Sequence, residues 1–220
     1  MTAFFSQQTA LLSRSTQRLV LAVCLAASVT ACAPIVISSV AGGAFVVSDR
    51  RTSGAQLEDG AIVIKANNAV RAVLGDRGNV NVSSYNRRVL VTGEVNTEQE
   101  KAQVIATISK VDNVQLVVNE LLVYIPSALS TRAKDTLATT RVKANLYDAQ
   151  DIMGSVVRVI TERGTVYLMG IVTQREADRA TDLASRTPGV AKVVQVFEVI
   201  SEAELARIQP PQKSEPAAAK

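Results

Sequence analysis

Few side chains in this sequence could carry out covalent or metal chemistry. The 220 residues include no histidine, which removes the commonest general base and the commonest metal ligand. Both cysteines, Cys24 and Cys32, lie near the N-terminus, so the remaining sequence can form neither a disulfide nor a cysteine metal site. No glycine-rich phosphate loop and no hydrolase-type serine motif is present. We therefore expect a non-enzymatic protein without catalytic residues, metal or cofactor, in which the reactive group of interest is a thiol.

The residues before that thiol follow a pattern typical of exported proteins. Arg14 and Arg18 precede an apolar run over residues 19–27. A positive segment followed by a short apolar segment describes a secretory signal peptide, here residues 1–31. The run is too short for a comfortable transmembrane helix.

The apolar run leads to Val29-Thr-Ala-Cys32, which resembles a bacterial lipobox. The resemblance implies diacylglyceryl transfer to the Cys32 thiol, cleavage between Ala31 and Cys32, and acylation of the new amine. Two alternatives stay open, a plain secretory signal with an incidental cysteine and an uncleaved anchor. Cys24 does not fit the lipidation site, because it lies inside the apolar run and follows Val23, which is too large to precede a cleavage site.

If Cys32 is acylated, the protein is attached to a membrane. More than one chain gives stable attachment, because each buried methylene contributes about 0.8 kcal/mol. Ala33, and not an aspartate, follows the cysteine. By resemblance to sorted lipoproteins, this favours a lipid anchor in the outer membrane, with the protein on the periplasmic face. Residues 32–55 are interpreted as a lipidated tether.

The overall charge argues against a nucleic-acid partner. Residues 1–31 contain two arginines and no acid, so 22 basic and 20 acidic side chains remain after them. Nucleic-acid binding usually requires a concentrated basic field, whereas this charge is nearly balanced.

The sequence after residue 55 repeats itself at a spacing of 76 to 78 residues. Four matching features in one order indicate a duplication. They are Lys65-Ala-Asn67 with Lys143-Ala-Asn145, Val89–Gly93 with Val166–Gly170, Thr97-x-x-Glu100 with Thr173-x-x-Glu176, and Val114–Val118 with Val190–Val194.

Each copy has the same order of predicted elements. A helix precedes a strand in which valines alternate, then a turn, and then a second strand that ends at a glycine and forms a hairpin with the first. A threonine and a glutamate then form a capping box for a second helix, and a β-rich strand follows. The predicted elements are helices at about 60–74 and 134–148, strands with Val80 and Val82 or Val157 and Val159, turns at 85–88 and 162–164, strand ends at Gly93 and Gly170, capping boxes at 97–100 and 173–176, and final strands 117–123 and 193–199.

These elements predict an α+β fold, in which each αββαβ copy places two helices on one face of a three-stranded mixed sheet. Copies this small favour packing on each other. We expect domains at 56–125 and 126–201, followed by a disordered tail at 202–220.

The pattern resembles the BON-domain family, and in particular its outer-membrane lipoproteins with two BON domains. The hairpin glycines Gly93 and Gly170, each followed by a helix and by the turn Asn113-Val114 or Gly189-Val190, carry this resemblance. The likeness covers roughly residues 20–200. It implies a protein that supports envelope integrity, is concentrated at the division site, and binds anionic phospholipid, chiefly phosphatidylglycerol, through the first helix of its second BON domain.

The family's lipid helix corresponds to residues 135–147. This segment suits an anionic membrane surface because its basic residues outnumber its acidic ones, and Asp135 is its only acid. The alternative is an ordinary solvated helix face, and the family usually has an aromatic residue where this sequence has Leu137. The resemblance assigns phospholipid binding to Leu137, Arg141, Val142, Lys143 and Tyr147.

A second function class remains open, a periplasmic adaptor that binds protein. The resemblance links the family to outer-membrane protein assembly and to control of septal peptidoglycan amidases. Lipid binding should weaken steeply with salt, whereas a specific protein groove need not respond in this way.

Overall fold

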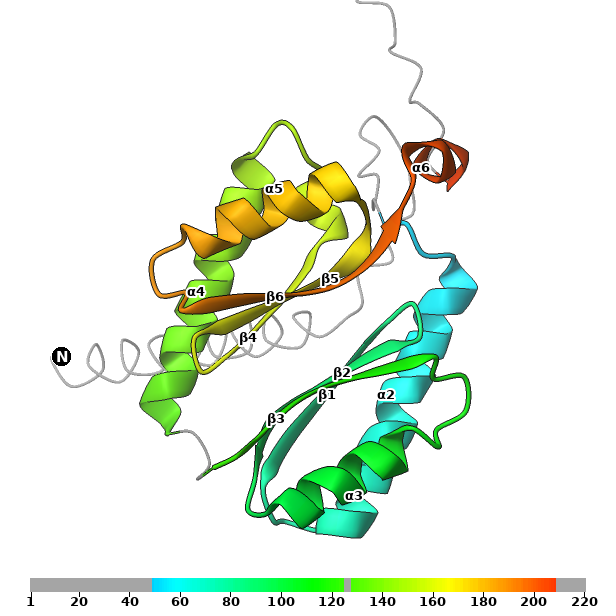
Figure 1. The fold of residues 1–220 in the computed structure, drawn as a ribbon, viewed down its shortest axis with the longest axis vertical. Coiled ribbons are helices and arrows are strands. Elements are labelled where there is room, and N and C mark those ends of the chain that lie inside the picture. The colour runs from blue at the N-terminus through cyan, green and yellow to red at the C-terminus, as the bar shows by residue number, and fades with distance from the viewer. Residues whose placement is uncertain (1–48, 125–127, 209–220) are drawn as a thin grey trace, which may run out of the picture. The chain divides into compact units, whose positions relative to one another are not determined.

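The computed structural model describes residues 49–124 and 128–208. The predicted signal peptide, Cys32, most of the tether and residues 209–220 lie outside the described residues. Two successive copies of one arrangement follow each other, here called the first repeat (53–124) and the second repeat (128–200) (Figure 1).

The first repeat forms an αββαβ unit with a mixed sheet of order β1-β2-β3. The first two strands pair antiparallel as a hairpin, and the third pairs parallel to the second after the helical crossover. Its elements are α2 (Ser53–Leu74), β1 (Asn79–Tyr85), β2 (Arg88–Val95), α3 (Glu98–Ile108) and β3 (Leu116–Val123).

The second repeat has the same topology, with sheet order β4-β5-β6 and the same antiparallel and parallel pairings. A short 3-10 turn precedes its first strand. Its elements are α4 (Leu129–Asp148), η2 (Gly154–Val156), β4 (Arg158–Glu162), β5 (Thr165–Thr173), α5 (Gln174–Ser185) and β6 (Lys192–Ile200). The predicted fold class is therefore confirmed, and both first helices begin several residues before the positions expected from periodicity.

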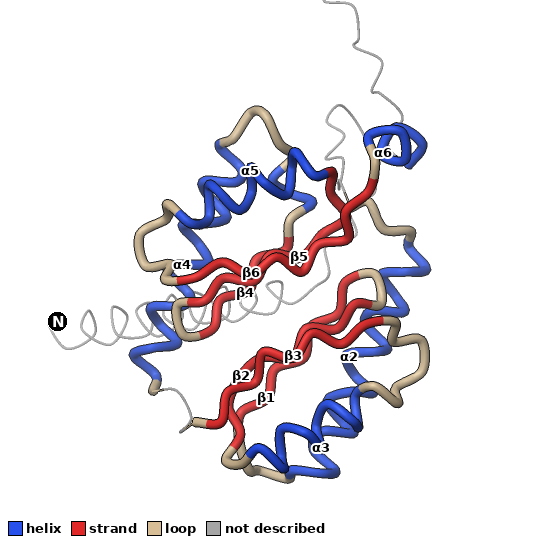
Figure 2. Tube along the Cα trace, in the orientation of Figure 1, coloured by secondary structure: helices blue, strands red, loops and turns tan. Residues whose placement is uncertain are grey.

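Both helices of each repeat cover one face of its sheet (Figure 2). In α2 the buried side chains Ile62, Ala66 and Val70 recur every fourth residue, and they pack on β2 valines and on Val104 of α3. This spacing keeps one helix face toward the sheet over several turns. The second repeat builds the corresponding core from Val, Leu, Ile and Ala, with Phe197 as its aromatic member.

The other face of each sheet is also buried. Tyr85 and Leu90 of the first repeat join a hydrophobic cluster with Tyr167, Met169 and Ile171 of the second repeat. Alternate residues of β2 and β5 therefore point into two different cores, which explains why almost every residue of these strands is buried. The repeats pack on each other, as their small size suggested.

The hairpin glycines lie inside strands rather than at strand ends. β2 continues past Gly93 to Val95, and β5 continues past Gly170 to Thr173. Gly93 has a φ of +111°, and a Cβ there would overlap the carbonyl oxygen of Asn79. A close approach between backbones, and not the end of a strand, therefore requires glycine at this position.

The prediction that residues 202–220 are disordered is wrong for the first seven of them. Residues 202–208 form the helix α6 (Glu202–Ile208). Ser201 begins this helix by accepting a hydrogen bond from the amide of Glu204, while the Glu204 carboxylate accepts one from the amide of Ser201. This reciprocal cap offsets the lack of apolar periodicity from which disorder was predicted.

Candidate functional site

Helix α4 presents two faces of opposite character. Asp135, Ala138, Val142 and Leu146 are buried against the sheet and α5. Val142 has no exposed surface and belongs to the hydrophobic core, so its side chain cannot touch a lipid. The predicted contact set is therefore corrected to Leu137, Arg141, Lys143 and Tyr147, all of which are exposed.

The exposed face of α4 combines apolar and basic side chains. Leu137 is 56% exposed and Tyr147 is 65% exposed. They are ten positions apart, almost three helical turns, and both lie away from the buried face of Asp135, Ala138, Val142 and Leu146. Small exposed residues fill the space along this stripe, and basic side chains border it on both flanks. The small residues are Ala133, Thr140 and Ala144, and the basic residues are Lys134, Arg141 and Lys143.

Two polar contacts attach the middle of α4 to the turn between α5 and β6. Arg141 Nη1 donates to the carbonyl oxygen of Pro188 at 3.2 Å, and Asn145 Nδ2 donates to Thr187 Oγ1 at 2.8 Å. These contacts place the Pro188–Gly189 turn beside the basic flank. They use one N–H of Arg141, and its exposed guanidinium can still approach an anion.

Asp135 is directed away from the exposed face. Its two carboxylate oxygens accept hydrogen bonds from the backbone amides of Arg163 and Gly164 at 2.9 and 2.8 Å. The carboxylate thereby caps the β4–β5 hairpin, a role that sequence spacing did not reveal. As a result, the only acidic side chain on the outward face of α4 is Asp148, the last residue of the helix.

The equivalent helix of the first repeat has a different surface. Asp59 likewise caps its hairpin, accepting from the amides of Asn86 and Arg87. Leu57 and Ile64 are exposed on α2, but Lys65 lies 3.4 Å from the carboxylate of Asp112. The first repeat therefore offers an apolar stripe without the two basic flanks of α4.

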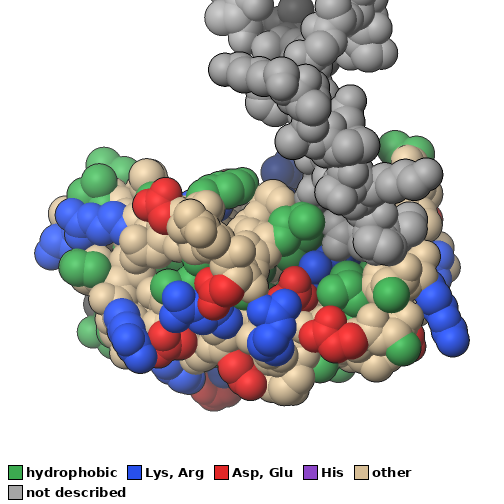
Figure 3. All heavy atoms as spheres, turned by 90° about the horizontal axis from the view of Figure 1, so that it is seen from above, with side chains coloured by type: hydrophobic (Ala, Val, Ile, Leu, Met, Phe, Trp, Pro, Cys, Tyr) green, Lys and Arg blue, Asp and Glu red, His purple; other side chains and the backbone are tan. Residues whose placement is uncertain are grey.

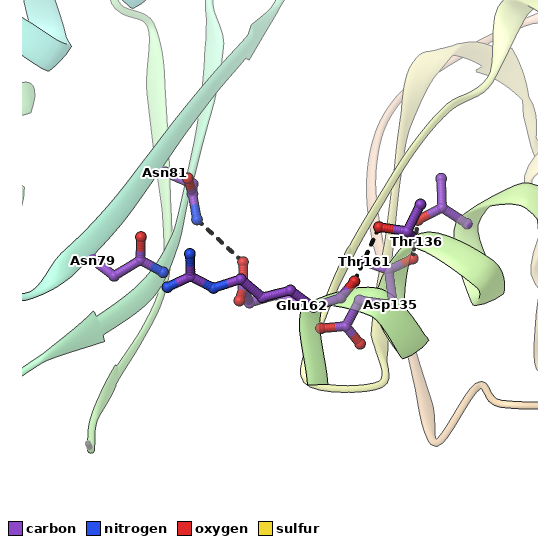
Figure 4. Close-up of a pocket in the computed structure, with 8 residues that line it drawn as sticks. Asn79, Asn81, Asp135, Thr136, Thr161 and Glu162 are labelled. Carbon is purple, nitrogen blue, oxygen red and sulfur yellow. Dashed lines mark hydrogen bonds between the residues drawn. The ribbon is translucent and has the colours of Figure 1, made fainter. Parts of the chain in front are cut away.

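A polar hollow of about 240 Å³ lies between β1 and the α4–β4 side of the second repeat. Figure 4 shows Asn79 and Asn81 of β1 facing Glu162, with Asp135 beside them. Asn81 Nδ2 donates to Glu162 Oε2 at 3.2 Å. Burial raises the pKa of Glu162 above its usual value, and the nearby charges of Glu94 and Asp135 raise it further.

The charge on the face shown in Figure 3 is mixed. Basic and acidic side chains alternate there, with no continuous area of one sign. This pattern fits the nearly balanced composition and leaves local features such as the α4 flanks to define any anionic partner.

Cys32 and Ala31 lie outside the described residues, so lipidation and cleavage remain predictions. Within 49–124 and 128–208, no helix is long and apolar enough to cross a membrane.

Comparison with known proteins links both repeats to one family. The profile of the BON domain matches residues 65–124 and again residues 134–201. These two stretches make up more than half of the chain, and each runs from within the first helix of a repeat to the end of its last strand.

Curated relatives extend this likeness over most of the sequence. The chain is 38% identical over 171 residues to the outer membrane lipoprotein DolP of Haemophilus influenzae, covering 77% of this chain and 89% of that protein. It is 27% identical over 154 residues to the 21 kDa hemolysin of Actinobacillus pleuropneumoniae, covering 69% and 79%. It is 31% identical over 160 residues to the osmotically-inducible protein Y of Escherichia coli, covering 69% and 77%. The chain therefore belongs to the BON-domain family and carries two BON domains in tandem.

Proposed function

We propose that this protein is an outer-membrane lipoprotein, acylated on Cys32, whose second repeat binds anionic phospholipid through the exposed face of α4. The lipobox pattern and the 38% identity to a protein named outer membrane lipoprotein support the anchor and its membrane. The family resemblance extends the proposal to phosphatidylglycerol as the lipid, the periplasmic face, a role in envelope integrity and location at the division site.

The observation that carries the proposal is the separation of charge and burial on α4. Asp135 is turned inward onto the hairpin amides, while Lys134, Arg141 and Lys143 remain exposed around Leu137 and Tyr147. Such a helix can lie in the headgroup region with its apolar side chains toward the acyl chains. Each basic residue near an anionic surface contributes about 1 kcal/mol.

The anchor and the helix act together in this account. A protein held at the bilayer by acyl chains meets lipid headgroups at a high effective concentration, so a weak site on α4 suffices. The lipid site thus determines how the second repeat contacts the membrane and which lipid lies beneath it, while the anchor supplies most of the affinity.

Vesicle flotation of the chain without residues 1–32 tests the lipid site apart from the anchor. All described contacts lie within 49–208, so this chain keeps every one of them. We expect flotation with phosphatidylglycerol vesicles at low salt and none with phosphatidylcholine vesicles. The double change Arg141→Glu and Lys143→Glu should lower the bound fraction tenfold or more, because it replaces two attractions of about 1 kcal/mol each with repulsion.

A matched control reverses two charges on the equivalent helix of the first repeat. Lys65→Glu and Arg71→Glu change the net charge by the same amount, and should leave most of the binding intact. Equal losses in both double variants would indicate attraction by total charge instead of a site. Absence of flotation would exclude lipid binding by α4 and favour the protein-adaptor alternative.

A further inference from the structure

The residues just before the first repeat are bound inside the second repeat. Arg50 donates from Nη1 to Glu176 Oε2 at 2.7 Å and from Nη2 to Glu176 Oε1 at 2.8 Å. Its Nη1 also donates to the carbonyl oxygen of Ile171 at 2.8 Å. The side chains of Arg50 and Glu176 are only 2% and 6% exposed, so this two-pronged ion pair is shielded from water and salt.

The next residue binds the first repeat instead. Arg51 Nη1 lies 2.7 Å from Asp59 Oδ2, the carboxylate that caps the β1–β2 hairpin. Its guanidinium carbon is 4.0 Å from the ring centre of Tyr85, within the range of a cation–π contact. Asp49 completes the group by accepting from Arg51 Nη2 at 2.6 Å.

The two repeats differ in where the basic partner of an equivalent glutamate comes from. Glu100 and Glu176 hold equivalent positions, and each accepts a backbone hydrogen bond at the start of its helix. Glu100 has its basic partner, Arg77, within the first repeat, and their charged atoms are 3.2 Å apart. Glu176 forms its buried ion pair with a residue from outside the second repeat.

We propose that residues 49–51 act as a clasp that closes the tandem by joining the end of the tether to both repeats at once. Arg50 holds Glu176, which caps α5 of the second repeat, and Arg51 holds Asp59, which caps the β1–β2 hairpin of the first repeat. The inference does not depend on lipid binding, because neither arginine belongs to the α4 surface.

The clasp has two physical consequences. Because adjacent residues hold different repeats, a pull on the tether is transmitted to both repeats and not to α2 alone. Opening the clasp leaves the buried carboxylate of Glu176 without its cation, which is costly in a dry environment. The clasp should therefore stay closed while both repeats are folded.

Limited trypsin digestion of the full chain in mild detergent tests the clasp, because trypsin cuts after arginine. Arg207 at the exposed end of α6 serves as a comparison site in the same molecule. We expect cleavage after Arg50 and Arg51 to be much slower than cleavage after Arg207. Glu176→Gln should accelerate it by about tenfold or more, since loss of a charged hydrogen bond raises the open population and cleavage follows that population.

Two further variants separate the clasp from general stability. Glu100→Gln makes the same chemical change at the equivalent position, where glutamine can still cap the helix, and should leave cleavage after residues 50 and 51 unchanged. Arg50→Lys keeps a trypsin site and a positive charge but loses the two-pronged geometry, and should accelerate cleavage. The proposal is overturned if the native chain is cut after Arg50 or Arg51 as fast as after Arg207, if Arg50→Lys leaves that rate unchanged, or if Glu100→Gln accelerates cleavage as much as Glu176→Gln.

Discussion

Asp59 and Asp135 hold equivalent positions in the two repeats, and each carboxylate accepts hydrogen bonds from two consecutive backbone amides of a hairpin turn. Each connects a first helix to the tip of the following hairpin. Asp59 carries more contacts, because it also accepts from Ser84 Oγ at 2.6 Å and pairs with Arg51.

This difference predicts unequal effects of the same substitution. Asp135→Asn should lower the free energy of unfolding by about 2 kcal/mol, because an amide cannot accept both backbone hydrogen bonds. Asp59→Asn should cost more, about 3 kcal/mol or above, because it also breaks an ion pair with a largely buried arginine. Urea unfolding followed by circular dichroism measures both values. Equal losses, or losses below about 0.5 kcal/mol, would show that these carboxylates do not hold the hairpins.

The pH dependence of stability should reveal Glu162. Burial, Glu94 and Asp135 all raise its pKa, so the folded protein binds the proton more tightly than the unfolded chain does. Its contribution is therefore most favourable below the ordinary value of 4.5 and is lost as pH rises through the folded pKa. Glu162→Gln should raise the melting temperature at pH 7, by about 4 °C at most for a half-buried group, and this gain should vanish in acid.

Another glutamate, Glu198 in β6, should respond in the opposite way. Glu198 accepts from Asn86 Nδ2 at 2.7 Å and lies 3.6 Å from Arg88 Nε. Glu198→Gln should therefore lower the melting temperature at pH 7. A gain from both glutamine variants would point to net charge, and would contradict the assignment to the surroundings of Glu162.

The two strand glycines should differ in their tolerance of alanine. At Gly93 a Cβ would overlap the Asn79 carbonyl oxygen and the backbone has positive φ, so Gly93→Ala should cost about 2–4 kcal/mol. At Gly170 a Cβ would lie 2.7 Å from the Val156 carbonyl oxygen without a positive φ, so Gly170→Ala should cost about 1–2 kcal/mol. Thermal unfolding of both variants tests the order, and the reverse order would contradict this account of the close approach at β1.

Local patterns predicted most of the fold because they reflect contacts between near neighbours. Thr173 and Glu176 form the expected capping box. In the first repeat, Thr97 caps as expected, whereas the Glu100 carboxylate accepts from the amide of Asn96, one residue before the cap. In α3, Val104 and Ile108 are fully buried against the sheet, four residues apart on one helix face.

Contacts between distant residues could not be predicted in this way. Asp135 reaches amides 28 and 29 residues away, and Arg50 pairs with a glutamate 126 residues away. The first contact depends on how α4 packs on the hairpin of its own repeat, and the second on how the residues before α2 meet the second repeat. Neither arrangement leaves a periodic trace in the sequence. A family resemblance likewise assigned Val142 to the lipid face, although its spacing from Leu146 places it in the core.

The absence of tryptophan from the sequence allows the most direct test of the central claim, that the exposed face of α4 contacts anionic lipid. Leu137→Trp provides a single tryptophan on this face, and Ile64→Trp provides its control on α2, where Ile64 is 64% exposed. We predict that phosphatidylglycerol vesicles shift the emission of the tryptophan at position 137 to shorter wavelength at low salt, that phosphatidylcholine vesicles do not, and that the control stays unchanged. An unchanged spectrum at position 137, or an equal shift at both positions, would contradict the claim.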